Sequence, residues 1–143
     1  MEGGKIYNNS ANAITSNMGG GNVIINITGG EICNNTKNNT NYGSAIYILS
    51  STYNNATINI YGNAKIYNNN NNSGYAINIK DSDSTLYINY KDHTPANASI
   101  YDNYQNGTNL NASIYIDSGI IYNGENTLTN CTPYNLAINP PNT

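Results

Sequence analysis

The residues that could do acid–base chemistry are eight carboxylates and a single histidine, in a chain of 143 residues. The carboxylates are Glu2, Glu31, Asp81, Asp83, Asp92, Asp102, Asp117 and Glu125. Glycoside hydrolysis needs two carboxyl groups facing each other across one cleft, roughly 5–10 Å apart. Because these carboxylates are scattered along the chain, we expect no catalytic residue and no enzyme.

Asp81 and Asp83 precede one expected strand, and Asp92 follows it. These three carboxylates would suit a weak calcium site, but Asp and Ser are also ordinary turn formers, and a solvated polar turn is the simpler interpretation. The lone His93 has no Cys or Ser partner in a recognisable motif, so we interpret it as a loop residue. We therefore expect no bound metal and no cofactor.

The charge pattern excludes two other classes of function. The five basic residues are all lysines, and the net charge is −3. Proteins that bind nucleic acids normally carry a basic patch, so we expect no nucleic-acid partner. No stretch approaches the ~20 apolar residues of a membrane span.

One phrase recurs along the chain and defines the elements that would position these residues. It reads GGKIYNN at 3–9, GGEICNN at 29–35, NAKIYNN at 63–69, ASIYDN at 98–103 and SGIIYN at 118–123. Its central isoleucines are Ile6, Ile32, Ile66, Ile100 and Ile121, at steps of 26, 34, 34 and 21 residues. Self-similarity at such a period is typical of stacked repeat architectures.

Short β runs fill the space between copies, for example at 23–27, 43–48, 56–60, 73–79 and 85–89. They are rich in isoleucine at period two, which indicates strands. We therefore predict an all-β parallel β-helix (a β-solenoid), with three short strands per coil and about four to five coils over residues 1–124. Residues 125–143 would form an irregular tail that contacts a neighbouring subunit.

Three columns of apolar side chains would form the core of this stack. The first holds Ile6, Ile32, Ile66, Ile100 and Ile121; the second holds Ile14, Ile46 and Ile77; the third holds Ile25, Ile58, Leu86 and Ile114.

An asparagine column is expected beside the first apolar column, because the phrase places Asn or Asp two residues after its isoleucine. Its members are Asn8, Asn34, Asn68, Asp102 and Asn123. An inward Asn at a corner can bond the backbone and the Asn above and below it, and it tolerates a left-handed backbone. We interpret this Asn ladder as structural.

The repeated phrase, with its Ala-Ile and Thr-Ile strands, resembles right-handed β-helix repeat surface proteins: the bacterial polymorphic surface proteins and the adhesin-like proteins of methanogenic archaea. The resemblance covers about residues 3–124. It implies a right-handed coil and an extracellular or cell-surface product.

Tyrosines should form an outward row on one face. They are Tyr7, Tyr67, Tyr101 and Tyr122, with Cys33 at the equivalent position of the second copy. A stacked aromatic row can simply stabilise parallel strands. It can also bind sugar rings or another chain, and both interpretations stay open.

Asn-x-Ser/Thr sequences in expected loops are candidate glycosylation sites. They are Asn38, Asn55, Asn71, Asn97, Asn106 and Asn111.

Neither terminus carries an amphipathic capping helix, so both ends of the stack should expose unpaired strand edges. Such ends favour either a fragment of a longer β-helix or a subunit that pairs head to tail into a homopolymer. Cys33 and Cys131 lie too far apart along the expected stack for an intrachain bridge, so an intermolecular disulfide would use them. We expect a structural filament or surface stalk; the alternative is an adhesin or carbohydrate-binding module that uses the Tyr row.

Overall fold

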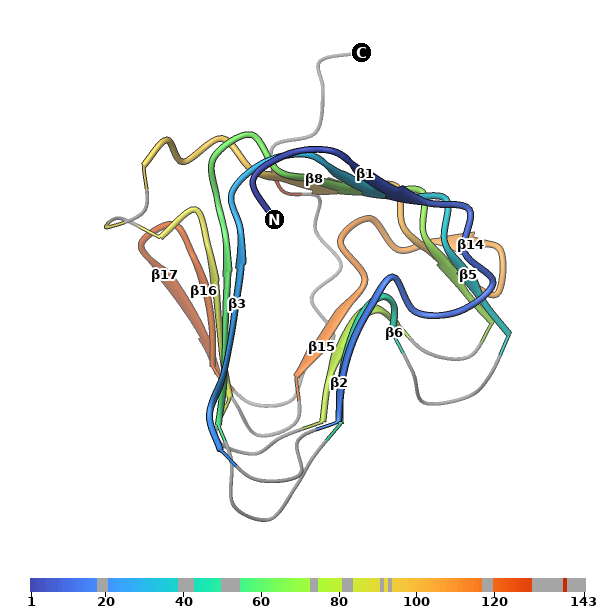
Figure 1. Ribbon diagram of the computed structural model, residues 1–143, viewed down its shortest axis with the longest axis horizontal. Coiled ribbons are helices and arrows are strands. Elements are labelled where there is room, and N and C mark those ends of the chain that lie inside the picture. Colours follow the sequence, from blue (N-terminus) through green and yellow to red (C-terminus); the bar gives the residue numbers. More distant parts are fainter. Residues whose placement is uncertain are drawn as a thin grey trace.

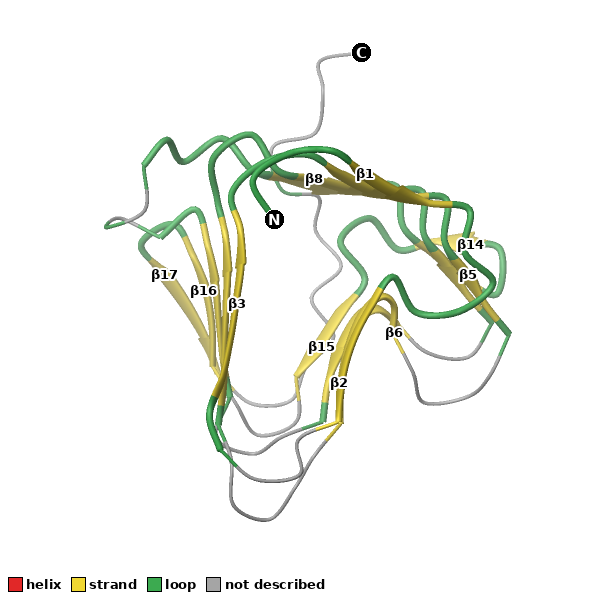
Figure 2. Cartoon of the chain, in the orientation of Figure 1, coloured by secondary structure: helices red, strands yellow, loops and turns green. Residues whose placement is uncertain are grey.

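The computed structural model describes residues 1–17, 21–38, 43–49, 55–72, 75–80, 84–90, 92, 94–116, 120–129 and 138. These residues form seventeen strands and no helix, in four sheets that surround one interior (Figures 1 and 2). The all-β prediction is confirmed. No helix in this described part of the chain could cross a membrane.

The repeated phrase forms the first sheet. Its strands are β1 (Lys5–Tyr7), β4 (Glu31–Cys33), β8 (Lys65–Tyr67) and β12 (Ser99–Tyr101), all parallel and in that spatial order. The register aligns Ile6, Ile32, Ile66 and Ile100, as the sequence predicts.

Two longer sheets close the interior. The second sheet holds β2 (Ile14–Asn17), β6 (Gly43–Leu49), β10 (Tyr75–Ile79) and β15 (Ile114–Ile116), all parallel. The third sheet holds β3 (Val23–Ile27), β7 (Ala56–Ile60), β11 (Thr85–Ile88), β16 (Ile120–Asn123) and β17 (Asn126–Thr129). Its first four strands are parallel, and β17 pairs antiparallel with β16.

A fourth, shorter sheet lies just after the Asn corner and was not predicted from the sequence. This corner sheet holds β5 (Thr36–Lys37), β9 (Asn70–Asn71), β13 (Tyr104–Gln105) and β14 (Thr108–Asn109). The first three strands are parallel, and β14 folds back antiparallel on β13. Two-residue polar strands carry no apolar alternation, so periodicity could not reveal them.

The core is a stack of isoleucines, and the last repeat corrects two column assignments. Ile114 aligns with Ile77 in the second sheet, not with the third column. Ile121 aligns with Leu86 in the third sheet, not with Ile100. The described strands therefore complete four repeats, and the phrase at 118–123 does not open a fifth.

The beginning of the stack is open. β1, β2 and β3 each stand at the end of their sheets, and no described strand pairs with their outer sides. Met1 covers the end of β3, since its N-terminal amine donates to Asn26 O at 2.6 Å and its carbonyl accepts from Thr28 N–H at 2.8 Å. The outer side of β5 is bonded to the first repeat, where Asn9 O accepts from Thr36 N–H at 2.9 Å. The isoleucines Ile6, Ile14 and Ile25 are half-buried in this first repeat. Their register partners Ile32, Ile46 and Ile58 are fully buried in the second.

The other end of the stack is covered in three of its four sheets by antiparallel backbone. β14 covers β13, and β17 covers β16. At β12, Ile100 and Ile138 exchange two backbone hydrogen bonds of 2.9 and 2.8 Å. The segment 126–129 and residue Ile138 therefore belong to the stack, although an irregular tail was expected from residue 125 onward.

Candidate functional site

The inner corner of each repeat is held by a ladder of asparagine amides. Asn9, Asn35, Asn69 and Asn103 form this inner ladder, and each Nδ2 donates to the Oδ1 of the next, at 2.8, 2.9 and 3.0 Å. Each Oδ1 also accepts the backbone N–H of the preceding Asn. Three of these four residues have no exposed surface. The ladder is one residue further along the phrase than the column expected from the sequence.

The expected column faces outward instead. Asn8, Asn34, Asn68 and Asp102 have φ of 55°, 55°, 54° and 47°, so they are the left-handed corner residues. Their side chains are exposed or half-buried, which corrects the inward assignment. Asn123 lies in β16 opposite Ile88 and is not part of this column.

The outer face of the first sheet carries the row Tyr7, Cys33, Tyr67 and Tyr101 in register. Tyr67 and Tyr101 stack with ring centroids 5.4 Å apart and planes 4° apart. Tyr7 is 53% exposed, whereas the Cys33 side chain between Tyr7 and Tyr67 is fully buried. The row is therefore an aromatic surface that is interrupted by the buried thiol of Cys33.

Tyr122 does not belong to this row. It stacks on Tyr87 in the third sheet, with centroids 4.9 Å apart and planes 7° apart, and Tyr90 is tilted against both rings. The sequence placed Tyr122 in the row because the tripeptide Ile-Tyr-Asn occurs both in the first sheet and in β16 of the third sheet.

A small charged cluster borders the Tyr row. Lys5 Nζ lies 2.9 Å from Glu31 Oε2, and the Tyr67 hydroxyl donates to the same oxygen at 2.9 Å. The hydrogen bond from Lys5, and then that from Tyr67, lower the pKa of Glu31, while the bond to Glu31 raises the pKa of Lys5. The hydrogen bond with Cys33, then burial and the bond to Glu31, raise the pKa of Tyr67 to about 12.

The candidate glycosylation sites differ in how far their asparagines are exposed. Asn38, Asn55, Asn97 and Asn106 are exposed, and Asn111 is half-buried. Asn71, in β9, has no exposed surface, so a glycan there would require the repeat to open. Asn71 is therefore a buried structural asparagine and not a candidate glycosylation site.

Cys33 is a free thiol in this structure. Because its side chain is buried, a disulfide through Cys33 would require neighbouring side chains to move. Cys131 lies outside the described residues, as do Asp81, Asp83, His93 and Asp117. Among the described residues, no three His, Cys, Asp or Glu side chains gather as a metal site would require.

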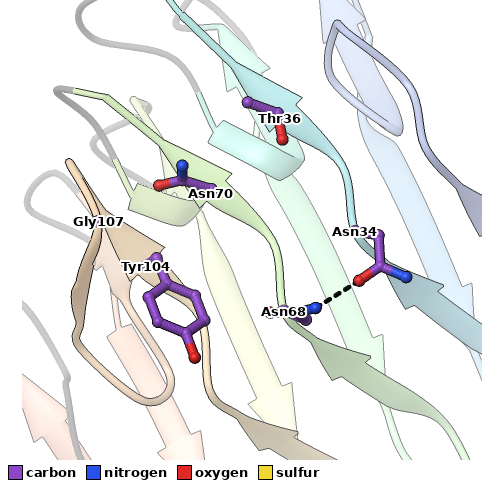
Figure 3. Close-up of a pocket in the computed structure, with 6 residues that line it drawn as sticks. All are labelled: Asn34, Thr36, Asn68, Asn70, Tyr104 and Gly107. Atoms are coloured by element: carbon purple, nitrogen blue, oxygen red, sulfur yellow. Dashed lines mark hydrogen bonds between the residues drawn. The ribbon is translucent and has the colours of Figure 1, made fainter.

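An open groove lies at the outer corner between the first sheet and the corner sheet (Figure 3). Its volume is about 430 Å³, and it is lined by Asn34, Thr36, Asn68, Asn70, Tyr104 and Gly107. Thr36, Asn70 and Tyr104 occupy the same register position of successive strands. The Asn68 amide donates to Asn34 Oδ1 at 2.5 Å along the groove. The residues of this groove were not singled out as one site by the sequence, because the corner sheet that aligns them was missed.

Comparisons of the chain with family models, with curated proteins and with solved structures gave no match.

Proposed function

We propose that this chain is a non-enzymatic structural protein, a β-solenoid with three main strands per coil, that joins a second copy of itself through the open edge of its first repeat. The observation that carries the proposal is the difference between the two ends. β1, β2 and β3 end their sheets over half-buried isoleucines, whereas β12, β13 and β16 are each covered by antiparallel backbone.

A second copy suits the open edge because the two edges are identical. Two copies related by a two-fold axis would pair their edge strands antiparallel, which is at least as favourable per residue as parallel pairing. Covering the half-buried isoleucines of both copies would add of the order of 1 kcal/mol for each side chain. Such an isologous contact closes on itself and produces a dimer.

The head-to-tail filament expected from the sequence has weaker support. It requires the open edge of one copy to continue the parallel ladders of another copy at its last repeat. β14 and β17 run antiparallel to those ladders, so they would interrupt the regular continuation. We extend the proposal to an extracellular or cell-surface location on the resemblance to repeat surface proteins alone.

The test uses a proline at the open edge. The Val23 N–H donates to Asn55 and the Ile27 carbonyl accepts from Tyr61, so both face β7. Since successive residues of a strand alternate in direction, the Ile24 N–H faces the open edge. Ile24→Pro therefore removes an edge donor and keeps the bonds to β7.

Light scattering after size-exclusion chromatography should give a dimer mass for the native chain and a monomer mass for Ile24→Pro. Ile24→Val keeps the N–H and a similar side chain, so it should remain a dimer. A monomeric native chain at all concentrations, or growth into long fibres, would contradict the proposal.

A second candidate function is glycan binding at the Tyr row. The observation that favours it is the exposed ring of Tyr7 next to the stacked pair Tyr67 and Tyr101. Loss of glycan binding in Tyr7→Ala, with the dimer intact, would support this function.

A further inference from the structure

We infer that the corner groove is a binding site for a neutral pyranose sugar, separate from the glycan site considered at the Tyr row. The inference goes beyond the structural role and does not depend on dimer formation. It rests on three properties of the groove: its dimensions, the chemistry of its lining and one unpartnered acceptor.

The groove has the size of a ligand site. Its volume of about 430 Å³ lies within the range of roughly 300–1,000 Å³ found for small-molecule sites. Two rows of side chains line it, one at the corner positions Asn34 and Asn68 and one on the corner sheet. Figure 3 shows these side chains on neighbouring strands, with the Tyr104 ring and the turn at Gly107 at one end.

The lining is neutral and rich in amides. Asn side chains offer both donors and acceptors, as pairs of neighbouring sugar hydroxyls require. The Tyr104 ring offers an apolar face, against which the C–H face of a pyranose can pack. No charged side chain is among the lining residues of this described groove, so an uncharged sugar is the better match.

Asn70 supplies the observation that points most directly to a ligand. Its Oδ1 has almost no exposed surface and no hydrogen-bond partner within the described structure. An unsatisfied buried acceptor is unfavourable, by about 1–3 kcal/mol in general, unless something donates to it. Because Oδ1 has almost no exposed surface, the half-buried Asn70 amide would have to rotate toward the groove for a sugar hydroxyl to provide that donor.

The backbone makes the groove rigid. Asn70 N–H donates to Asn35, Tyr104 N–H donates to Asn69 and Asn106 N–H donates to Asn71, at 2.8, 2.8 and 2.9 Å. These bonds hold β9 and β13 and the turn after β13 in fixed register. The site would therefore be formed before the ligand arrives, which limits the entropic cost of binding.

Saturation-transfer NMR of the full chain with methyl hexosides of glucose, galactose, mannose and N-acetylglucosamine tests the inference, with galacturonate as an anionic comparison. We expect saturable binding of at least one neutral sugar and weaker binding of galacturonate. Tyr104→Ala should weaken binding about tenfold, the equivalent of one stacking interaction. Asn70→Ala should also weaken binding without lowering the melting temperature, because its Oδ1 has no partner to lose.

Tyr115→Ala is the matched control, since Tyr115 stacks on Tyr75 in the second sheet, outside the groove lining. It should bind sugar as the native chain does. The inference fails if no neutral sugar binds saturably, or if binding survives in both Tyr104→Ala and Asn70→Ala. It also fails if Tyr7→Ala abolishes binding while Tyr104→Ala does not, which would place the site on the Tyr row.

Discussion

Neighbouring asparagines in the repeated phrase have different structural tasks. Asn68 adopts the left-handed backbone and points outward, while Asn69 turns inward with no exposed surface. Asn69 Nδ2 donates to Tyr67 O in its own repeat, to Ile32 O in the preceding repeat and to Asn103 Oδ1 in the following repeat. The Asn-Asn pair thus combines a corner residue with a residue that bonds the repeats together.

This division predicts unequal losses of stability for two substitutions. Asn69→Ala leaves several buried groups unpaired, so it should lower the free energy of unfolding by about 3 kcal/mol or more. Asn68→Gly keeps a residue that accepts positive φ and should change stability by less than about 1 kcal/mol. Urea denaturation followed by circular dichroism measures both. Equal effects of the two substitutions would contradict the inward placement of the ladder.

Tyr67 makes a prediction for alkaline pH. Hydrogen bonding to Cys33, burial and hydrogen bonding to Glu31 raise its pKa to about 12, so the folded chain favours the neutral phenol. This contribution to stability is complete below pH 10 and is lost as the pH rises from about 10 to about 12. Absorbance titration of tyrosinate should show a late step that is absent in Tyr67→Phe. A Tyr67 step near pH 10 would contradict the hydrogen-bonded arrangement.

At the scale of elements, isoleucine spacing predicted most of the strands. The expected strand at 23–27 coincides with β3, and the one at 56–60 with β7. The error came in the last repeat, where the phrase at 118–123 was assigned to the first sheet. Ile114 follows Ile100 by 14 residues, just as Ile46 follows Ile32. The spacing within the second repeat is therefore the better guide to Ile114, whereas the Ile-Tyr-Asn motif is shared by two sheets.

The corner sheet and the antiparallel strands could not be predicted in this way. β5, β9 and β14 consist of two polar residues each, and their positions follow from the backbone stack beneath them. Residues 126–129 contain one apolar residue, Leu128, so period-two alternation gave no signal for β17. The groove depends on these elements, and therefore it emerged only with the structure.

Edge and interior strands should respond differently to proline. Thr57 is the register partner of Ile24, but it lies in β7, between β3 and β11. Thr57→Pro removes a ladder hydrogen bond inside the sheet, so it should lower the melting temperature clearly. Ile24→Pro should leave the melting temperature of the separated monomer nearly unchanged. Similar losses in both variants would show that β3 is not an open edge.

At the scale of the whole molecule, the four sheets share a direction along the stack. The stack begins with parallel strands that no described strand pairs on their outer sides, and Met1 covers only the end of β3. It ends with strands that the chain itself covers (Figure 1). From the sequence both ends were expected to be open, because only a helical cap was considered. Antiparallel return strands can cover an edge as well, and here they make the two ends chemically different.

Amide hydrogen exchange, followed by NMR as the protein concentration rises, tests the central claim most directly because it identifies which end associates. The account predicts that the amide of Ile24 and the outward amides of β1 and β2 become protected as dimers form. The amides of β14 and β17 should exchange at the same rate throughout. If the amides of β17 or β15 gain protection together with Ile24, the copies join head to tail, and association through the open edge alone is wrong.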